Sequence, residues 1–104
     1  MSYAVYTTEN FEKEMNKLSP EDIRQIQKIF FQVKENPYVG DQLRYKHLRE
    51  KRIREKRIYY FVYDDLMSVL FAAISGKKDQ QETINHLIKY LDDYKIYLEK
   101  ILKI

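Results

Sequence analysis

Arginine and lysine side chains gather in the middle of the chain, where they could bind a phosphate group. Residues 44–57, RYKHLREKRIREKR, hold eight basic and two acidic residues, a charge of +6, whereas the whole chain carries +3. Guanidinium groups bind phosphate oxygens through paired hydrogen bonds and stabilise charge that develops on them. The pattern indicates a phosphate-rich or acidic partner. The candidate catalytic cations are Arg52, Arg54, Arg57 and Lys78.

The spacing of these cations predicts where they lie. Arg52 and Arg54 are two residues apart, so in an extended strand their side chains point to the same side. Arg57 begins an otherwise apolar run, where a charge is costly unless it has a partner or a function. Lys78 follows the next predicted strand, and a hairpin would bring it close to Arg57. The alternative is that these cations only protect a strand edge and form a basic turn.

Further basic and aromatic side chains could bind a single-stranded nucleic acid, because bases stack on rings while phosphates meet cations. Tyrosine supplies ten of the 104 residues. The predicted RNA-binding residues are Arg44, Lys46, Arg49, Lys51, Lys56, Tyr59 and Lys77. Tyr45 and Tyr63 are further stacking candidates, and His47 and His86 are possible acid–base groups. The alternative is that the tyrosines line the rim of the core and that the histidines are ordinary surface residues.

Composition excludes several classes of site. The chain has no cysteine, so it has no disulfide, no thiolate zinc site and no thiol nucleophile. Two glycines cannot form a glycine-rich phosphate loop, and two histidines cannot form a histidine-rich metal site. We therefore expect no metal and no cofactor. No apolar run approaches the roughly 18 residues of a membrane span, and the N-terminus does not resemble a secretory signal, so we expect a cytoplasmic protein.

Capping residues and apolar periodicity predict the N-terminal elements. Alternation over Ser2–Thr7 indicates a short strand. Thr8 and Ser19 are predicted N-caps for two helices, about Glu9–Lys17 and from Pro20 to the Asn36-Pro37 dipeptide. A connection of a residue or two predicts an antiparallel helix hairpin whose apolar faces turn to one sheet.

The middle of the chain predicts a sheet. A loop over Tyr38–Gln42 precedes predicted strands at Leu43–Leu48, Arg52–Arg54, Arg57–Tyr63 and Ser68–Ser75. In the central strand, the alternate residues Ile58, Tyr60 and Val62 should meet the helices. The opposite face, Arg57, Tyr59, Phe61 and Tyr63, is aromatic and is a candidate working surface.

A long helix is predicted over about Gln80–Leu102. Apolar residues follow an a/d heptad pattern at Ile84, Leu87, Leu91, Tyr94, Leu98 and Ile101. Such a helix spans roughly 30–35 Å, longer than the roughly 23 Å of a seven-residue strand. Its end is either a frayed core helix or an overhang that packs on another protein, including a second copy. The predicted fold is α+β: one domain, residues 1–104, with a strand and helix hairpin on a small antiparallel sheet.

Three segments, in this order, resemble the RelE/ParE toxin superfamily. They are YTTENFEKEMNKLSPEDIRQIQKIFFQVKENPY, RIREKRIYYFVYDD and ISGKKDQQETI, and the resemblance extends over Tyr3 to Leu91. It implies a RelE-like fold and a toxin of a type II toxin–antitoxin pair. RelE-type members cleave mRNA in the ribosomal A site without a metal, by attack of the ribose 2′-hydroxyl on the adjacent phosphate. ParE-type members poison gyrase.

The resemblance also implies roles for single residues. Arg52 and Arg54 take the places of two basic strand residues, Arg57 that of a phosphate-binding arginine, and Lys78 that of the basic residue after the glycine. Ile84 stands where the family has a tyrosine, and an isoleucine transfers no proton. Arginine is also too basic to accept a proton readily.

The predicted function is a ribosome-dependent mRNA endoribonuclease that inhibits translation. Two alternatives remain: a non-catalytic ParE-like toxin acting on a protein such as gyrase, and an RNA-binding domain without cleavage. The implied partners are mRNA, the ribosome and a cognate antitoxin that is acidic or partly disordered. A homodimer through the C-terminal helix is a further expectation.

Overall fold

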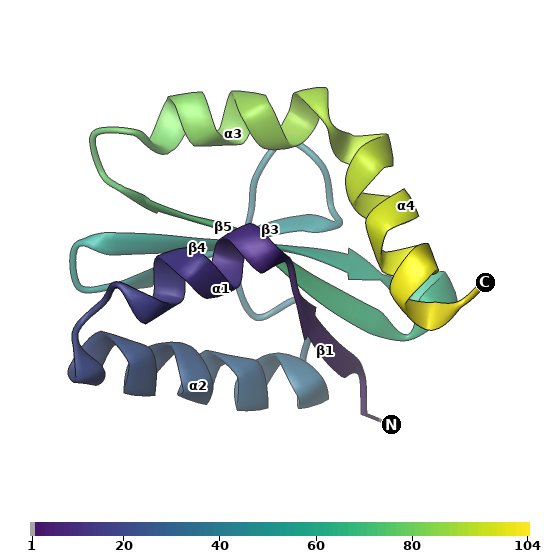
Figure 1. Cartoon of the computed structure of the whole chain (residues 1–104), viewed down its shortest axis with the longest axis horizontal. Helices are drawn as coiled ribbons and strands as arrows, with labels where there is room; N and C mark the ends of the chain where they lie inside the picture. Colours follow the sequence, from purple (N-terminus) through teal and green to yellow (C-terminus); the bar gives the residue numbers. More distant parts are fainter. Residues whose placement is uncertain (1) are drawn as a thin grey trace.

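A five-stranded sheet lies between two pairs of helices in the computed structural model, which describes residues 2–104 (Figure 1). The strand order is β1-β5-β4-β3-β2. This arrangement confirms the predicted α+β class. The elements are β1 (Ala4–Thr7), α1 (Glu9–Asn16), α2 (Pro20–Glu35), β2 (Asp41–Gln42), β3 (Leu48–Ile53), β4 (Lys56–Tyr63), the 3-10 turn η1 (Asp64–Leu66), β5 (Ser68–Gly76), α3 (Gln80–Lys89) and α4 (Leu91–Leu102).

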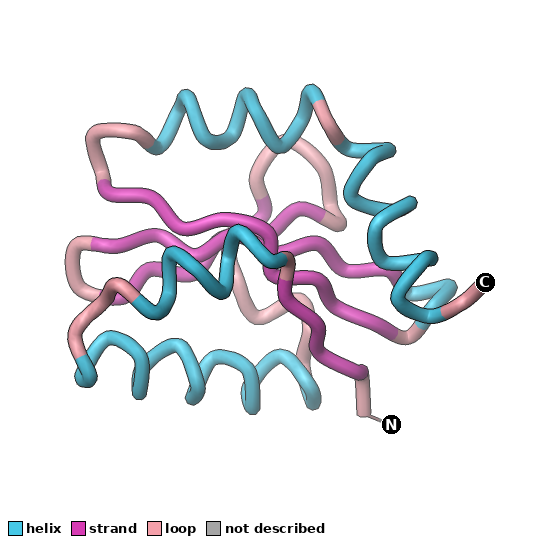
Figure 2. The backbone as a smooth tube through the Cα atoms, in the orientation of Figure 1, coloured by secondary structure: helices cyan, strands magenta, loops and turns pink. Residues whose placement is uncertain are grey.

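The two N-terminal helices begin at their predicted caps. The Thr8 hydroxyl oxygen accepts a hydrogen bond from the Phe11 N–H at 3.0 Å, and the Ser19 hydroxyl oxygen accepts one from the Asp22 N–H at 3.2 Å. Each bond satisfies an N–H group that the first helical turn cannot pair. The helices form the expected antiparallel hairpin (Figure 2).

The apolar stripe of this hairpin packs on the predicted face of the central strand. Phe11 of α1 and Ile26 of α2 are fully buried against the face of β4 that carries Ile58, Tyr60 and Val62. Helical and strand periodicities therefore meet in one core, as the sequence predicts.

The opposite face of β4 is not an exposed working surface, so that prediction is wrong. Tyr59 and Phe61 are 0% exposed and Tyr63 is 6% exposed, because α3 and α4 cover them with Leu87 and Leu98. The strand is apolar on both sides, and each apolar face of a sheet must be buried against another layer. Figure 1 shows α2 on one side of the sheet and α3 on the other.

The strand before β4 lies later in the chain than predicted. Residues 43–47 form a loop, β3 begins at Leu48, and Asp41–Gln42, predicted as loop, forms β2. Pairing with β4 sets this register, with Leu48 opposite Phe61 and Arg52 opposite Arg57. Cross-strand contacts outweigh the low strand propensity of the charged residues.

β1 pairs in parallel with β5, so the sheet is mixed rather than purely antiparallel. The connection from β1 to β5 contains the helix hairpin and the other strands, and this length permits a parallel arrangement.

The predicted single C-terminal helix is two helices. They break at Tyr90, with φ −110° and ψ 26°. α4 then packs against the sheet, where Leu98 is fully buried, instead of extending beyond it. The predicted overhang is therefore wrong, and Ile101, a predicted core position, is 41% exposed. Within residues 2–104, no helix is long and apolar enough to cross a membrane.

Candidate functional site

The β3–β4 turn and the end of β5 enclose a basic pocket. The cavity measures about 420 Å³, and its lining contains six cations and one carboxylate. Arg57 lines this cavity, and because β4 pairs on both sides, Arg57 lies opposite Arg52 on β3 and opposite Ser75 on β5. Lys78 lines the same cavity, as the hairpin geometry predicts. The basic pocket is lined by Arg52, Arg54, Glu55, Lys56, Arg57, Gly76, Lys77 and Lys78.

Arg57 is a buried cation on β4. Its residue is 6% exposed, and its Nε has no hydrogen-bond partner within residues 2–104. It takes part in none of the ion pairs found among those residues. A buried charge is costly unless it is paired and hydrogen-bonded. The arrangement fits an anion that enters the cavity and completes the pairing.

Arg52 and Arg54 line the same pocket, but they do not extend from one strand as the spacing predicted, because only Arg52 belongs to β3. Arg52 is exposed on β3 and faces Arg57 across the strands. Arg54 lies in the two-residue turn with φ 46° and forms ion pairs of 3.0 Å with Glu21 and 3.1 Å with Asp22. Both carboxylates belong to the first turn of α2. Their negative charges largely neutralise the charge of Arg54.

Next to Arg57, two hydroxyl groups form a short chain of hydrogen bonds. The Tyr59 hydroxyl lies 2.8 Å from Ser75 Oγ, and Ser75 Oγ donates to the Gly76 carbonyl at 3.0 Å. Either hydroxyl can donate in the bond between Tyr59 and Ser75. Burial raises the pKa of Tyr59, and the bond to Ser75 partly opposes that rise. The fully buried Tyr59 ring cannot stack on an RNA base, which corrects its predicted role.

Sequence reasoning missed Glu50. It is 7% exposed on β3, lies opposite Tyr59, and its Oε2 accepts a hydrogen bond from Gln80 Nε2 at 2.8 Å. Because its neighbours in the sequence are arginines and lysines, Glu50 looks like an ordinary surface residue that pairs with them. Alternation starting at Leu48 would have found it, because that alternation places Glu50 and Arg52 on the same side.

The other end of β3 holds a separate group of cations, so the basic stretch does not form one patch. Arg49 donates to three backbone carbonyls, with Nε 3.0 Å from the Gly40 oxygen and the two terminal nitrogens 3.1 and 3.0 Å from the Lys46 and Tyr38 oxygens. These bonds make Arg49 a structural residue and correct its predicted RNA-binding role.

The remaining predicted cations lie in three places. Arg44 and Lys46 are exposed in the loop before β3, and Lys51 points to the side that faces α2. Strand β3, from Leu48 to Ile53, is roughly 17 Å long, and this length separates the cations at its two ends. Lys56 and Lys77 line the basic pocket with Arg57.

No histidine and no α3 aromatic ring lines the basic pocket. Ile84, at the place of the expected tyrosine, packs into the core beneath α3 and α4. His47 lies against the rings of Phe61 and Tyr63, and burial, then the charge of Lys95, lowers its pKa. Across residues 2–104, no three acidic or histidine side chains come together as metal ligands.

Comparison with known proteins identifies the fold. No family profile and no curated protein matches the sequence. The structure of a free E. coli toxin RelE with two arginines replaced by alanine superposes with a TM-score of 0.74 and 24% identity, covering 86% of this chain and 97% of that one. The archaeal RelE–RelB complex of Pyrococcus horikoshii gives 0.67 and 15%, covering 74% and 97%. The toxin–antitoxin complex RelBE2 of Mycobacterium tuberculosis gives 0.64 and 21%, covering 74% and 93%.

Proposed function

We propose that this chain, which has the RelE-like fold, is the toxin of a type II toxin–antitoxin pair and cleaves mRNA on the ribosome. The observation that carries the proposal is Arg57, a buried cation in a pocket of six cations, whose Nε has no hydrogen-bond partner in the described part of the chain. A phosphodiester would supply the missing anion, and the Arg57 guanidinium would bind two of its oxygens through paired hydrogen bonds. The proposed site of action is the cytoplasm, where translation is inhibited.

The proposed reaction is attack of a ribose 2′-hydroxyl on the adjacent phosphate. Negative charge grows on the phosphate oxygens as the new bond forms, and cations already in place stabilise it most effectively. Arg57 and Arg52, paired across the strands, are assigned to those oxygens. Lys78 can donate a proton to the leaving 5′ oxygen, which a guanidinium cannot do readily.

Glu50 is assigned to accept the proton of the attacking hydroxyl. It lies on the same side of β3 as Arg52, and a carboxylate is basic enough for that role. Glu50 does not line the pocket, so the role requires the Gln80 side chain, now hydrogen-bonded to it, to move aside. Glu50→Gln keeps the size of the side chain and should slow cleavage roughly 100- to 10,000-fold.

The experiment is induction of this chain alone in a bacterial host, with primer extension on a translated reporter mRNA. Translation-dependent cuts are expected, and they should disappear in the double variant Arg57→Ala with Lys78→Ala. The matched control is Arg24→Ala with Lys28→Ala, which removes the same charges from the exposed side of α2. Growth arrest that persists unchanged in the pocket variant would overturn the assignment of this site.

Ile84 favours a second candidate, a ParE-like toxin that binds a protein such as gyrase without cleaving RNA. Its packing in the core means that α3 brings no hydroxyl group into the pocket. Growth arrest with intact mRNA would select this candidate. RNA binding without any arrest would select the third reading, an RNA-binding domain without cleavage.

The proposed partner is an antitoxin with an acidic, partly disordered segment. RelE proteins of E. coli and P. horikoshii were solved in complexes with RelB, which supports a partner of this kind. Such a segment would neutralise the basic pocket. A homodimer through α4 also remains a proposal, and Ile96 and Ile101, 48% and 41% exposed, are the side chains it would use.

A further inference from the structure

Strand β5 is paired on both sides over only half of its length. β1 pairs with Ser68–Phe71, the Thr8 N–H donates to the Phe71 carbonyl at 3.0 Å, and the Thr8 hydroxyl donates to the Ala72 carbonyl at 3.4 Å. The chain then turns into α1. Within residues 2–104, no strand pairs with residues 73–76 on that side. The free edge of a strand is a template for another extended chain.

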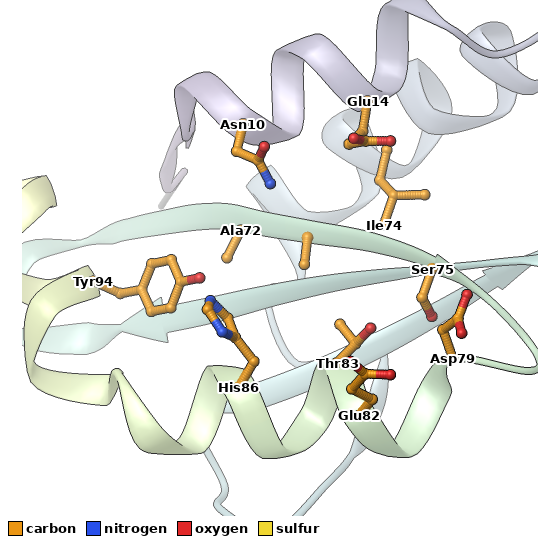
Figure 3. Close-up of a pocket in the computed structure, with 11 residues that line it drawn as sticks. Asn10, Glu14, Ala72, Ile74, Ser75, Asp79, Glu82, Thr83, His86 and Tyr94 are labelled. Atoms are coloured by element: carbon orange, nitrogen blue, oxygen red, sulfur yellow. The ribbon is translucent and has the colours of Figure 1, made fainter.

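A groove follows this free edge (Figure 3). Its cavity of about 450 Å³ has α1 and α3 as walls and four consecutive β5 residues, Ala72 to Ser75, as its floor. α1 packs in the core on one face of the sheet and α3 in the core on the other face, so a cavity that touches both helices and β5 between them lies along the edge of the strand. A second cavity of about 450 Å³ continues the groove towards α4 and shares Asn10, Ala72, His86 and Tyr94 with the first.

The groove is acidic, in contrast to the basic pocket. Glu14, Asp79 and Glu82 line its first part, Glu9 and Asp93 line its second part, and neither part is lined by a lysine or an arginine. Lys17 approaches Glu14 at 3.5 Å, but both side chains are exposed and the pair is weak. The acidic lining disfavours a nucleic acid and favours a cationic occupant.

The α4 end of the groove is aromatic. Tyr90, Tyr94 and Tyr97 line it together with Ala72, and the Tyr97 hydroxyl accepts a hydrogen bond from the Glu9 N–H at 3.2 Å. Small residues on β5 leave room beside these rings. An apolar side chain next to a cation therefore fits this end of the groove.

We propose that the acidic groove binds an extended, lysine- or arginine-bearing segment of a protein partner. The segment adds a strand to the free half of β5 through main-chain hydrogen bonds. Its cations lie near Glu14 and Glu82, and an apolar side chain lies against Tyr94. This interaction goes beyond the proposed RNA chemistry, because it uses none of the residues of the basic pocket.

The test measures fluorescence anisotropy of a labelled, end-blocked decapeptide of alternating lysine and valine with the purified full chain. Binding to the wild type is expected, and Glu14→Lys with Glu82→Lys should weaken it at least tenfold. Glu35→Lys with Asp92→Lys, exposed positions that do not line the groove, changes the net charge equally and should stay within twofold.

A second comparison tests the strand pairing. The same peptide with N-methylated backbone amides keeps its charge but loses its main-chain donors, and it should bind at least tenfold more weakly. Amide resonances of residues 73–75 should shift in the complex. Equal binding of the N-methylated peptide, or equal binding of a glutamate–valine decapeptide, would overturn the proposal.

Analytical sedimentation of the chain alone tests whether a second copy of this chain, and not another protein, occupies the groove. A monomer is expected for both the wild type and Asn10→Trp, which fills the groove from α1. If the wild type is a dimer and Asn10→Trp is a monomer, the assignment of a different protein as the partner would be overturned. Because these assays use no RNA and no growth arrest, their failure is distinct from failure of the proposed toxin function.

Discussion

Replacing Arg57 by methionine distinguishes the effect of the buried charge on stability from its effect on anion binding. Methionine keeps an unbranched apolar stem and removes the guanidinium, whose Nε is buried without a partner. An unsatisfied buried donor costs about 1–3 kcal/mol, and its removal offsets much of the packing that is lost. Without ligand, the unfolding free energy of Arg57→Met should therefore stay within about 1 kcal/mol of the wild type, or rise.

Binding should respond in the opposite direction. Hydrogen bonds to a charged group contribute about 1.5–3 kcal/mol, so losing the Arg57 contact should weaken binding of a phosphodiester roughly 10- to 150-fold. The probe is a short oligoribonucleotide with 2′-deoxy substitution, which cannot be cleaved. At ten times the wild-type Kd it stabilises the wild type by about 1.4 kcal/mol, and it stabilises a variant with 100-fold weaker binding by less than about 0.1 kcal/mol.

The assay is thermal unfolding followed by circular dichroism, with and without the oligonucleotide. For a chain of this size, about 1 kcal/mol corresponds to roughly 4–8 °C in Tm. The control is Lys77→Met, which removes an exposed cation from the same pocket and should keep most of the ligand-induced shift. A loss of more than about 3 kcal/mol in ligand-free Arg57→Met would refute the claim that the guanidinium is unsatisfied. Equal ligand-induced shifts in Arg57→Met and the wild type would refute its role in binding the anion.

Two further predictions concern the opposite end of β3 and the turn after β4. Arg49→Ala removes the donors to three backbone carbonyls and should lower the unfolding free energy by about 2 kcal/mol, and an unchanged urea midpoint would contradict this. Tyr3 and Tyr38 both donate to Asp64 at 2.6 Å and lower the pKa of Asp64, so stability should fall as the pH drops below about 4, whereas Asp64→Asn should flatten that dependence. Burial and the same contact raise the pKa of Tyr38 to about 12, so stability should also fall as the pH rises above about 10; equal Tm profiles of both proteins from pH 3 to 12 would contradict both effects.

Helix starts could be predicted because their causes are local. A hydroxyl at Thr8 or Ser19 satisfies an N–H group three residues later, and these bonds form wherever the helix packs. The apolar run of β4 was equally clear. The sequence did not show that helices cover both faces of β4, because periodicity shows that a face is apolar without showing which other element packs on it.

The candidate site could be predicted in part. Arg57 and Lys78 could be placed together from a hairpin, since two antiparallel strands bring their ends close. The register of β3 could not be predicted, because its charged residues carry little strand propensity and pairing with β4 selects it. That register moves Arg54 into a turn, where it pairs with Glu21 and Asp22.

The sequence by itself determined the helix hairpin, the apolar central strand and the excess of cations near one turn, because each depends on neighbours along the chain. The tertiary structure decided which charges are free. Arg49 donates to three carbonyls and Arg54 pairs with two carboxylates, whereas the buried Arg57 has no partner at its Nε among residues 2–104. Among residues 2–104, it also left one edge of the second half of β5 without a partner strand, beside an acidic groove. Such differences depend on contacts between residues far apart in the chain, and the cost of a charge depends on what surrounds it in the fold.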